Sequence, residues 1–303
     1  MPNYAYYNQK FMPLTEAKMG VMTNFMHYGT GVFEGIRGSW NQARQQLYLF
    51  RLKEHYERML KGCKTLKIDL PYSADDMVKL TIELVQRSGL KESQYIRPLA
   101  YKSTEAIGVR LHNLKSDFLI FNLPWTRYLE KDICAVGVSS WRRPGNNFSI
   151  PNAKLTGQYI NSAFTKTEAI ECGYEEAIVL NEWGRVAEGS GENIFLVVDG
   201  KLVTPSASES ILVGITRNSI IEIAARELGV ETVERPVERG ELYTCQEAFF
   251  TGTATNVAAI GSIDHRPVGN GQIGPITQKL SDIYVDIIQG NNPAYMHWCT
   301  PVF

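Results

Sequence analysis

Three amphipathic patterns in the second half of the chain each end at a glycine, and this arrangement most strongly limits the possible folds. The helical stretches and their terminal glycines are 157–172 with Gly173, 216–228 with Gly229, and 276–289 with Gly290. Glycine after the last apolar residue is typical of a helix C-terminus, because it adopts a left-handed conformation without strain. Short strand-like runs lie between them, at 176–180, 193–198 and 247–251. Asp199-Gly200 follows the second run and indicates a hairpin.

The first half mixes strands and helices in the same way. Strand-like runs occupy 46–51, 94–101 and 118–123. Ser73 begins a helix, because its hydroxyl can cap the first turn while Asp76 completes a capping box, and Gly89 ends it. Strands and helices alternate along the whole chain without a regular βαβ repeat. The sequence therefore predicts an α+β or mixed α/β fold.

The chain has 303 residues, which exceeds the usual size of one hydrophobic core, so two domains are expected. Residues 124–132 break the apolar rhythm after a buried strand. We therefore expect a small N-terminal α/β domain over 1–123, an interdomain linker over 124–134 and a large C-terminal domain over 135–303.

The formal net charge of −1 argues against a nucleic-acid or anionic-membrane partner. Arg142-Arg143 is too short for a nucleic-acid patch and is typical of a solvated face or a loop beside an anionic ligand. No run approaches the roughly 20 apolar residues that cross a bilayer, and the N-terminus does not resemble a secretory signal. The five cysteines are scattered without a Cys-x-x-Cys, which favours reduced thiols in the cytoplasm.

Two other kinds of site are not supported by the spacing. No two of the five histidines are four residues apart, so no metal site is expected. Gly269-x-Gly271-x-x-Gly274 matches a dinucleotide fingerprint, and a dehydrogenase is the function that it would imply. Too little chain follows it for the next strand and its ribose-binding acid, so a surface turn is the better interpretation.

One lysine stands among segments that suit a single cofactor. Lys154 lies between a proline turn and a helical pattern, where a lysine alone would be a solvated helix start. Glu188 begins the glycine-rich stretch Glu188-Gly189-Ser190-Gly191-Glu192-Asn193, where backbone can approach a ligand closely. Gly214-Ile215-Thr216-Arg217 begins a helix whose free N–H groups favour phosphate. Gly252-Thr253-Ala254 adds a hydroxyl and turn amides.

An amine, a carboxylate and a phosphate cradle are together what pyridoxal phosphate requires. The lysine forms an imine with the aldehyde, and the carboxylate keeps the pyridine nitrogen protonated so that the ring accepts electrons.

These segments, in this order, resemble the fold-type-IV pyridoxal-phosphate enzymes, and closely the branched-chain amino acid aminotransferases. The similarity runs from Tyr6-Tyr7-Asn8 to about Pro275. It includes His27-Tyr28-Gly29-Thr30-Gly31-Val32-Phe33-Glu34-Gly35-Ile36-Arg37 and Tyr95-Ile96-Arg97-Pro98-Leu99. The resemblance implies the two-domain fold-type-IV architecture, with the C-terminal domain binding the cofactor.

The resemblance also assigns roles around the cofactor. Lys154 matches the catalytic Schiff-base lysine and proton shuttle, Glu188 the partner of the pyridine nitrogen, and Tyr159 the phenol on the ring hydroxyl. The implied cofactor-binding residues are Arg51, Lys154, Tyr159, Glu188, Gly191, Glu192, Leu212, Gly214, Ile215, Thr216 and Thr253. Arg51, Ile215, Thr216 and Thr253 match the donors to the phosphate.

Tyr95 and Arg97 alternate with Ile96 on a strand, so both side chains face one way. By the resemblance, Tyr95 and the turn amides at Thr253 and Ala254 receive the α-carboxylate, and Arg97 receives the distal carboxylate of glutamate. The implied substrate-binding residues are Tyr28, Phe33, Gly35, Tyr95, Arg97, Ile107, Val109, Trp125, Tyr128, Thr253 and Ala254. By the resemblance, four aromatic members of this set (Tyr28, Phe33, Trp125, Tyr128) form a wall around the aliphatic side chain of the substrate. The resemblance also implies that the loop Ile107-Gly108-Val109 of one subunit covers the pocket of its partner.

The expected enzyme moves amino groups between leucine, isoleucine or valine and 2-oxoglutarate, as in branched-chain amino acid biosynthesis, and glutamate and 2-oxo acids are its other substrates. Its minimal unit is a homodimer, with a hexamer as the larger alternative. Rivals with the same fold are D-amino acid aminotransferase, (R)-amine aminotransferase, a dual-specificity enzyme and 4-amino-4-deoxychorismate lyase. A scaffolding protein that kept only the fold would be expected to have lost Lys154 or Glu188, and both are present.

Overall fold

The computed structural model describes residues 3–125 and 133–303. Two compact units make up the chain. Unit 1 comprises Met1–Thr126, Ala153–Gln158 and Asp286–Phe303, and unit 2 comprises Arg127–Asn152 and Tyr159–Val285. The segment that carries Lys154 therefore packs with the N-terminal part of the chain, as do the last eighteen residues, 286–303. Most of the linker expected over 124–134 lies outside the described residues.

Unit 1 contains an antiparallel sheet. Within the described residues its strand order is β17-β5-β4-β6-β7-β1-β2, with β3 also paired to β6. The strands are β1 Tyr4–Tyr7, β2 Lys10–Pro13, β3 Gly31–Phe33, β4 Ile36–Asn41, β5 Gln46–Phe50, β6 Gln94–Lys102, β7 Ser116–Pro124 and β17 Cys299–Pro301. Strands β3 and β4 pair in turn with β6, placing Phe33 opposite Leu99 and Ile36 opposite Ile96. The short connection between β3 and β4 therefore lies beside the middle of β6.

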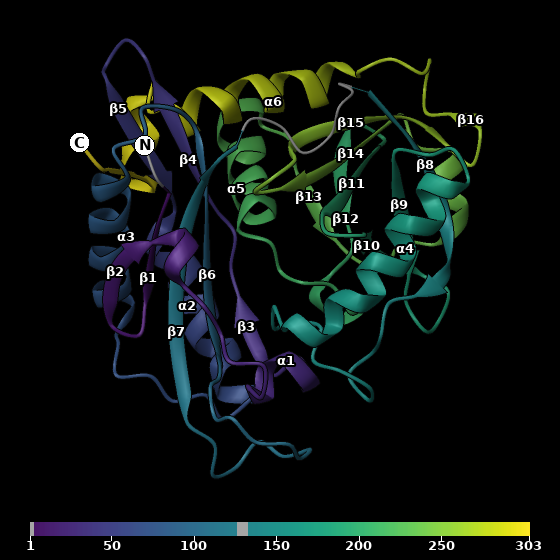
Figure 1. Cartoon of the computed structure of the whole chain (residues 1–303). Coiled ribbons are helices and arrows are strands. Elements are labelled where there is room, and N and C mark those ends of the chain that lie inside the picture. The colour runs from purple at the N-terminus through teal and green to yellow at the C-terminus, as the bar shows by residue number, and fades with distance from the viewer. Residues whose placement is uncertain (1–2, 126–132) are drawn as a thin grey trace. The chain divides into compact units, whose positions relative to one another are not determined.

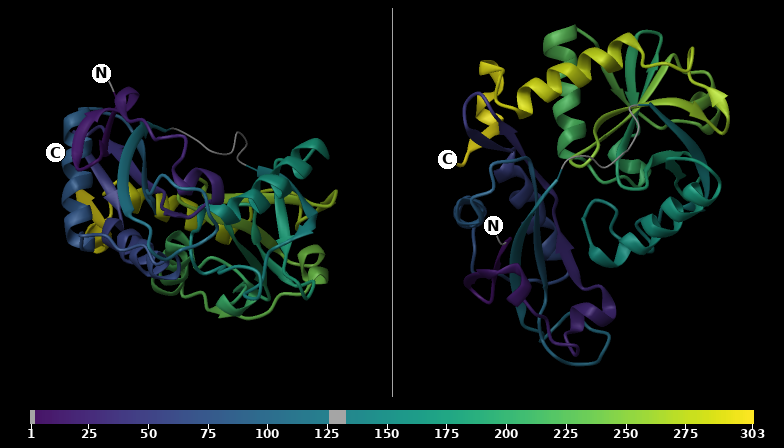
Figure 2. Two further views of the ribbon diagram at one scale, coloured as in Figure 1. Left: turned by 60° about the horizontal axis from the view of Figure 1, so that its bottom comes forward. Right: turned by 45° about the horizontal axis from the view of Figure 1, so that its top comes forward.

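Among the described residues, three α-helices lie wholly within this unit. They are α1 Asn24–Tyr28, α2 Leu52–Thr65 and α3 Ala74–Ser88. Helices α2 and α3 lie on one face of the sheet (Figure 1, Figure 2) and bury Tyr56 and Leu84 in its core. The capping box at Ser73 and Asp76 is confirmed, and Gly89 ends α3 with a φ of 62°.

Unit 2 contains a mixed sheet. Within the described residues the order is β10-β9-β8-β15-β14-β11-β12-β13, with β16 paired to β15. The strands are β8 Ile133–Arg142, β9 Glu176–Leu180, β10 Val186–Gly189, β11 Asn193–Val198, β12 Lys201–Thr204, β13 Thr232–Glu234, β14 Glu247–Gly252, β15 Asn256–Ile263 and β16 Arg266–Pro267. The pairs of β8 with β9, β8 with β15 and β12 with β13 are parallel. The hairpin signal between β11 and β12 is confirmed, since Asp199 and Gly200 have φ values of 50° and 73°.

The helical patterns of the second half are also confirmed. They form α4 Tyr159–Glu171, α5 Ile215–Ile223 with a π-helical turn over Ala224–Leu228, and α6 Pro275–Ile288. Short 3-10 turns occupy Leu14–Glu16, Thr156–Gln158, Ala207–Glu209, Arg239–Tyr243 and Pro293–Trp298. Helix α4 packs on β8 and β9, and α5 packs on β14. Gly173, Gly229 and Gly290 adopt φ values of 83°, 63° and 72°, as expected for residues that end helices.

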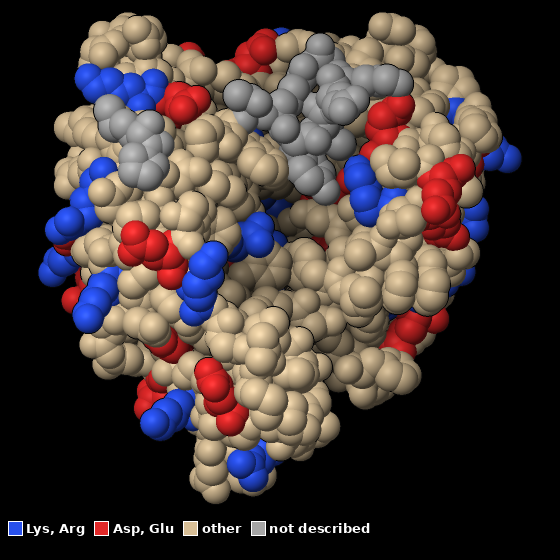
Figure 3. All heavy atoms as spheres, viewed as in Figure 1, with Lys and Arg blue, Asp and Glu red and all other residues tan. Residues whose placement is uncertain are grey.

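The distribution of charge on the surface and the hydropathy of the helices complete the description of this mixed α/β fold. On the face shown in Figure 3, Lys and Arg side chains are interspersed with Asp and Glu. Among the described residues, no helix combines the length and apolar character that crossing a membrane requires.

Candidate active site

Lys154 lies on a segment that is held against β3 in unit 1. The N–H of Phe33 donates to the carbonyl of Lys154 at 3.1 Å. Two residues later, the Thr156 hydroxyl donates to the Gly29 carbonyl at 2.7 Å. The ammonium of Lys154 is 5.0 Å from the centre of the Phe33 ring. The backbone around the lysine is therefore fixed, and its side chain lies over an aromatic ring.

A buried charge cluster supports the same stretch of chain. Glu34 lies between Phe33 and Gly35 and is fully buried. Arg58 donates from Nε and Nη2 to its two carboxylate oxygens, both at 2.7 Å, and His55 Nδ1 lies 2.8 Å from Oε2. Burial alone would raise the pKa of Glu34, but Arg58 and His55 outweigh it and hold that pKa well below its usual range. Burial also lowers the pKa of His55, so a neutral imidazole donates to an ionised carboxylate.

Tyr95 and Arg97 share one side of β6, as the alternation with buried Ile96 predicts. Arg97 Nη2 donates to the Tyr95 hydroxyl at 3.0 Å. The guanidinium carbon of Arg97 lies 4.7 Å from the centre of the Phe33 ring and 5.2 Å from that of Tyr95. A cation is therefore held between two aromatic rings.

Two buried donors of this cluster, one of them on the cation itself, have no partner in the part of the chain that the structure describes. Arg97 Nε and Trp125 Nε1 are each buried without a hydrogen-bond partner within the described residues. The rings of Tyr95 and Trp125 are 5.1 Å apart, so both donors belong to one cluster. A Cβ on Gly35 would lie 2.0 Å from the Tyr95 hydroxyl, so a side chain at this position would displace it. Because an unpaired buried donor is costly, the cluster indicates a site for an acceptor from a ligand.

The predicted loop residues Ile107 and Val109 lie on the surface of unit 1, exposed by 59% and 89%. The N–H of Gly108 between them donates to the Tyr28 hydroxyl at 3.0 Å. The loop is thus tied to one member of the aromatic wall of its own chain, while its apolar side chains face outward. Tyr128, another expected member of that wall, lies outside the described residues.

Arg51 directly follows β5 and precedes α2, with a left-handed φ of 46°. Its Nε lies 2.9 Å from Glu54 Oε1, and its guanidinium lies 4.6 Å from the centre of the Trp298 ring. The expected contact of Arg51 with a phosphate stays a prediction.

Glu188 in unit 2 is buried and held by three donors. Its Oε1 lies 2.9 Å from Arg143 Nε, and its Oε2 accepts from the Leu212 N–H at 3.0 Å and from Asn193 Nδ2 at 3.3 Å. Three donors, one of them cationic, favour the ionised carboxylate. Arg143 and Asn193 were not among the residues expected from the sequence. Of the two interpretations of Arg142-Arg143, the solvated face is wrong for Arg143, because its side chain is buried, whereas a loop beside an anionic ligand stays a prediction.

The phosphate cradle expected at 214–216 forms the start of α5. Gly214 is the N-cap residue, and no side chain of the described residues caps this helix. The first-turn N–H groups of a helix have no intrahelical acceptor, so they are available to an anion. A Cβ on Gly214 would lie 2.1 Å from Asn193 Oδ1, so a side chain at this position would displace the Asn193 amide. The Thr216 hydroxyl, 3.4 Å from that of Tyr284, is buried in the same turn.

The remaining expected residues of unit 2 lie on loops and one helix end. Tyr159 begins α4, and Gly191 lies in the loop between β10 and β11 with open space around it. Thr253 and Ala254 form the turn between β14 and β15. Glu192 differs from the others, because its carboxyl is buried and directed toward neighbouring protein groups.

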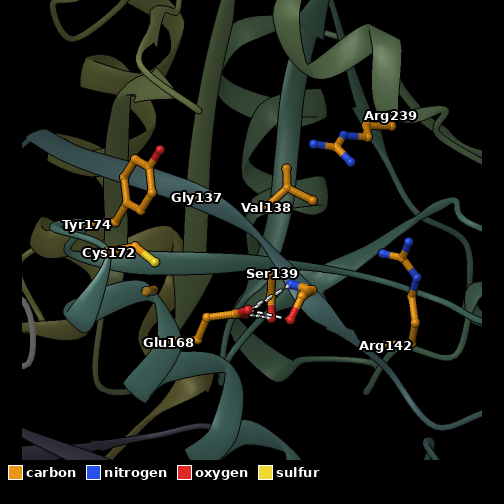
Figure 4. Close-up of a pocket in the computed structure, with 10 residues that line it drawn as sticks. Gly137, Val138, Ser139, Arg142, Glu168, Cys172, Tyr174 and Arg239 are labelled. Atoms are coloured by element: carbon orange, nitrogen blue, oxygen red, sulfur yellow. Dashed lines mark hydrogen bonds between the residues drawn. The ribbon is translucent and has the colours of Figure 1, made fainter.

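Unit 2 also contains a cavity of about 310 Å³ (Figure 4). It is lined by residues of β8 and α4, among them Ser139, Ser140 and Glu168. Both serine hydroxyls donate to the Glu168 carboxylate, and the Ser140 N–H adds a third bond at 3.0 Å. This carboxylate is already supplied with donors, and no residue expected to bind cofactor or substrate lines the cavity.

The chain is similar to known proteins over most of its length. The sequence model of the class IV aminotransferases matches residues 31–263. A protein of Aquifex aeolicus named "Probable branched-chain-amino-acid aminotransferase" is 47% identical over 304 residues, which cover 99% of this chain and 97% of the relative. The branched-chain aminotransferase of Thermoproteus uzoniensis, solved with norvaline, superposes with a TM-score of 0.96 at 42% identity and covers 100% of both chains.

A second branched-chain amino acid aminotransferase, that of T.th., was solved with N-(5'-phosphopyridoxyl)-L-glutamate and gives a TM-score of 0.94 at 39% identity over 100% of this chain and 99% of the other. The chain belongs to the class IV aminotransferases and, within them, to the branched-chain amino acid aminotransferases. The predictions of the family, the fold class, the transaminase activity and the pyridoxal-phosphate cofactor are confirmed.

Proposed function

We propose that this protein transfers the amino group of L-leucine, L-isoleucine or L-valine to 2-oxoglutarate, and that one pocket accepts the aliphatic and the acidic substrate in turn. The solved neighbours carry ligands of both kinds, norvaline in one and a phosphopyridoxyl derivative of glutamate in the other. The observation that carries the proposal is the setting of Arg97.

Arg97 lies among apolar groups, and its cationic guanidinium has an N–H that forms no hydrogen bond within the described residues. Phe33 and Tyr95 present aromatic rings to its guanidinium, and such rings suit an aliphatic side chain. A second carboxylate is costly to bury unless a cation meets it. Arg97 can meet it, because its Nε has no partner within residues 3–125 and 133–303 and a guanidinium can hold a carboxylate at two points.

The residues present fit pyridoxal phosphate on their own chemistry. Lys154 supplies an amine on a fixed backbone, Glu188 a carboxylate kept ionised by Arg143, and the start of α5 a set of free N–H groups. Lys154, Tyr159, Glu188 and the 214–216 turn would hold the cofactor, with Arg51 and Thr253 as further phosphate donors. When bound, pyridoxal phosphate supplies an electron sink for the negative charge left at the substrate α-carbon.

Each residue then has a defined task. The Nζ atom of Lys154 takes the proton from the α-carbon and returns it, and Glu188 keeps a proton on the pyridine nitrogen by its negative charge. Tyr95 and the amides of Thr253 and Ala254 orient the α-carboxylate. Phe33 excludes water from the aliphatic side chain.

A coupled assay tests this function. Purified protein with pyridoxal phosphate is given leucine, isoleucine or valine together with 2-oxoglutarate, beside D-alanine and (R)-1-phenylethylamine as donors. The three L-amino acids should form glutamate, and Lys154→Ala should abolish turnover. Faster turnover of either control donor would support the D-amino acid or (R)-amine alternative. Borohydride reduction and peptide mapping should label Lys154, and a label on Lys166 would refute its assignment.

We further propose a homodimer as the minimal active unit, with a hexamer as the larger alternative. The outward-facing Ile107 and Val109 support it, because apolar side chains exposed to this extent suit a neighbouring subunit. Lys154→Ala and the double variant Ile107→Asp/Val109→Asp should each be inactive alone. A mixture should regain partial activity, because a hybrid dimer contains one site with an intact lysine and an intact loop. Full activity in a demonstrated monomer would refute the dimer.

The cytoplasm is the proposed location. All five cysteines are free thiols, and four of them are buried, which accords with a reducing compartment. Cell fractionation should find the protein in the cytoplasmic fraction, and recovery outside the cell would contradict the assignment.

A further inference from the structure

We propose that Glu192 is a positioning residue whose carboxyl ties the loop carrying Glu188 to the turn carrying Thr253 and Ala254. This role rests on the proposed function, because it matters to catalysis only if that turn receives the substrate carboxylate. Glu192 was expected to bind the cofactor, as its neighbour Gly191 was. Its carboxyl lies between two protein segments, and its expected contact with the cofactor stays a prediction.

The contacts of Glu192 join two neighbouring hairpin loops. Strands β11 and β14 pair with Asn193 opposite Thr251, so the loop before β11 and the turn after β14 lie side by side. Glu192 Oε2 accepts from the Gly191 N–H at 3.0 Å, and the Thr255 hydroxyl lies 3.2 Å from Oε1. Oε2 therefore contacts the loop between β10 and β11, and Oε1 contacts the turn between β14 and β15.

Two glycines leave the room that this side chain occupies. A Cβ on Gly189 would lie 2.8 Å from Glu192 Oε2, and a Cβ on Gly252 would lie 3.5 Å from its Cγ. The N–H of Gly189 donates to the Glu192 carbonyl at 2.6 Å, which closes the loop between β10 and β11. The carboxyl thus fills a gap lined by both loops, and its side chain is 4% exposed.

The charges around Glu192 disfavour a second negative charge. Burial, and after it the carboxylate of Glu176 on β9, raise the pKa of Glu192 to about 8. Lys166 on α4 opposes this rise, but it is already paired with Glu176 at 2.8 Å. The buried thiol of Cys134 on β8 also faces the group, and burial raises its own pKa to about 11. Burial and Glu176 therefore favour the protonated form of Glu192 at neutral pH, against the Gly191 N–H and the Thr255 hydroxyl, whose hydrogen bonds lower its pKa.

Ionisation would place a second negative charge in this cluster. Two buried carboxylates, those of Glu176 and Glu192, would then share Lys166, which the neutral form of Glu192 avoids. Glutamine is a matched mimic of the neutral form, because its carbonyl can accept from Gly191 while its amide donates to Thr255. It does not titrate.

The first test compares wild type with Glu192→Gln by urea unfolding between about pH 5 and pH 9, with no substrate present. A free glutamate has a pKa of about 4.3, so the folded state keeps a proton that the unfolded state has lost. The contribution of Glu192 to the unfolding free energy of the wild type therefore falls as pH rises from about 4.3 to about 8, and then levels off. The two midpoints should coincide near pH 5, and the variant should unfold at higher urea near pH 8. Coinciding profiles across the whole range would overturn the assignment.

The second test follows the link to the turn through Thr255. Thr255→Val keeps the shape and removes the hydroxyl, whereas Thr255→Ser keeps the hydroxyl as the matched control. Losing one buried hydrogen bond should raise KM for leucine by about fivefold to tenfold in Thr255→Val, with a smaller change in kcat and near-normal KM in Thr255→Ser. The pH profile of kcat/KM is measured for wild type and for Glu192→Gln, and each profile is normalised to its own maximum. The wild-type profile should decline at alkaline pH, and the Glu192→Gln profile should lack this decline. An unchanged KM in Thr255→Val, or the same decline in both profiles, would overturn the positioning role. A wild type without transaminase activity would instead refute the proposed function, and the unfolding comparison would still report on Glu192.

Discussion

Arg143 Nε lies 2.9 Å from Glu188 Oε1, and both side chains are buried. The pair joins the end of β8 to β10, and Asn193 on β11 donates to the same carboxylate. A buried carboxylate without a cation would tend to bind a proton. Arg143 therefore favours the negative form of Glu188, and in the proposed function this charge would support the electron-sink chemistry of the cofactor.

The first prediction concerns this arginine. Arg143→Met should lower kcat by about 10- to 100-fold, a loss of roughly 1.4 to 2.7 kcal/mol of transition-state stabilisation. Arg143→Lys keeps the charge but loses the planar donor, so it should fall between wild type and Arg143→Met. Steady-state kinetics with leucine measure both.

The double variant separates a shared role from general damage. Glu188→Gln alone should slow turnover by about two decades or more. Adding Arg143→Met should then cost little further, because residues that act through one another are not additive. Full additivity of the two losses would show that Arg143 does not act through Glu188.

Local signals in the sequence were sufficient for much of the fold. The α3 cap at Ser73, the Asp199-Gly200 hairpin and the glycines that end α4 and α6 each depend on the chemistry of a few adjacent residues. Strand β17 is different, because a three-residue run has no readable period and exists only through its pairing with β5.

The candidate site divides in the same way. Lys154, Glu188 and Arg97 could be proposed as site residues from the sequence because they lie in motifs that a family resemblance covers. Arg143 could not, since adjacent arginines look like a solvated surface until the fold buries one of them. The role of Glu192 likewise depends on Thr255, which is 63 positions away in the chain.

The second prediction concerns the buried pair of Glu34 and Arg58. Glu34→Gln leaves the Arg58 guanidinium without its charge partner and should cost roughly 3–5 kcal/mol of unfolding free energy. Glu34→Gln/Arg58→Met should regain part of that loss, because no unpaired charge remains. The pKa of Glu34 is lowered on folding, so its stabilisation is present above a pH of about 4.3 and is lost only as pH falls well below that value. Urea midpoints near pH 7 measure these effects, and a loss below about 1 kcal/mol in Glu34→Gln would contradict the prediction.

The third prediction is a pH dependence that arises from His55. Its pKa is lowered on folding by burial, whereas an unfolded histidine titrates near 6.5. Below about pH 6.5 the unfolded chain therefore binds a proton that the folded chain does not, and wild-type stability falls as pH drops. His55→Gln can still donate to Glu34 and should show a flatter profile between about pH 5 and pH 7. His112→Gln, at an exposed histidine, is the matched control and should follow wild type. Parallel profiles for all three proteins would mean that His55 is not held neutral.

The fourth prediction concerns the two substrates that one pocket must accept. Leucine needs the aromatic surfaces of Phe33 and Tyr95, and it makes no use of a guanidinium. Glutamate brings a second carboxylate, which only a buried cation can hold at acceptable cost. Arg97 has the required position, since Nη2 is engaged by Tyr95 while Nε has no partner among the described residues.

Arg97→Leu should therefore damage the glutamate half-reaction far more than the leucine half-reaction. Losing a buried charge-assisted pair costs roughly 2–5 kcal/mol. For glutamate this corresponds to a decrease of about 30- to 5,000-fold in the ratio of the rate constant to KM. Leucine should lose only what the altered packing beside Phe33 removes, and Arg97→Lys should recover part of the glutamate reaction because it keeps the charge. Pre-steady-state conversion of the bound cofactor by each amino acid separately measures the two half-reactions. An equal loss for both amino acids would show that Arg97 supports Tyr95 and the α-carboxylate that all substrates share, rather than the distal carboxylate of glutamate.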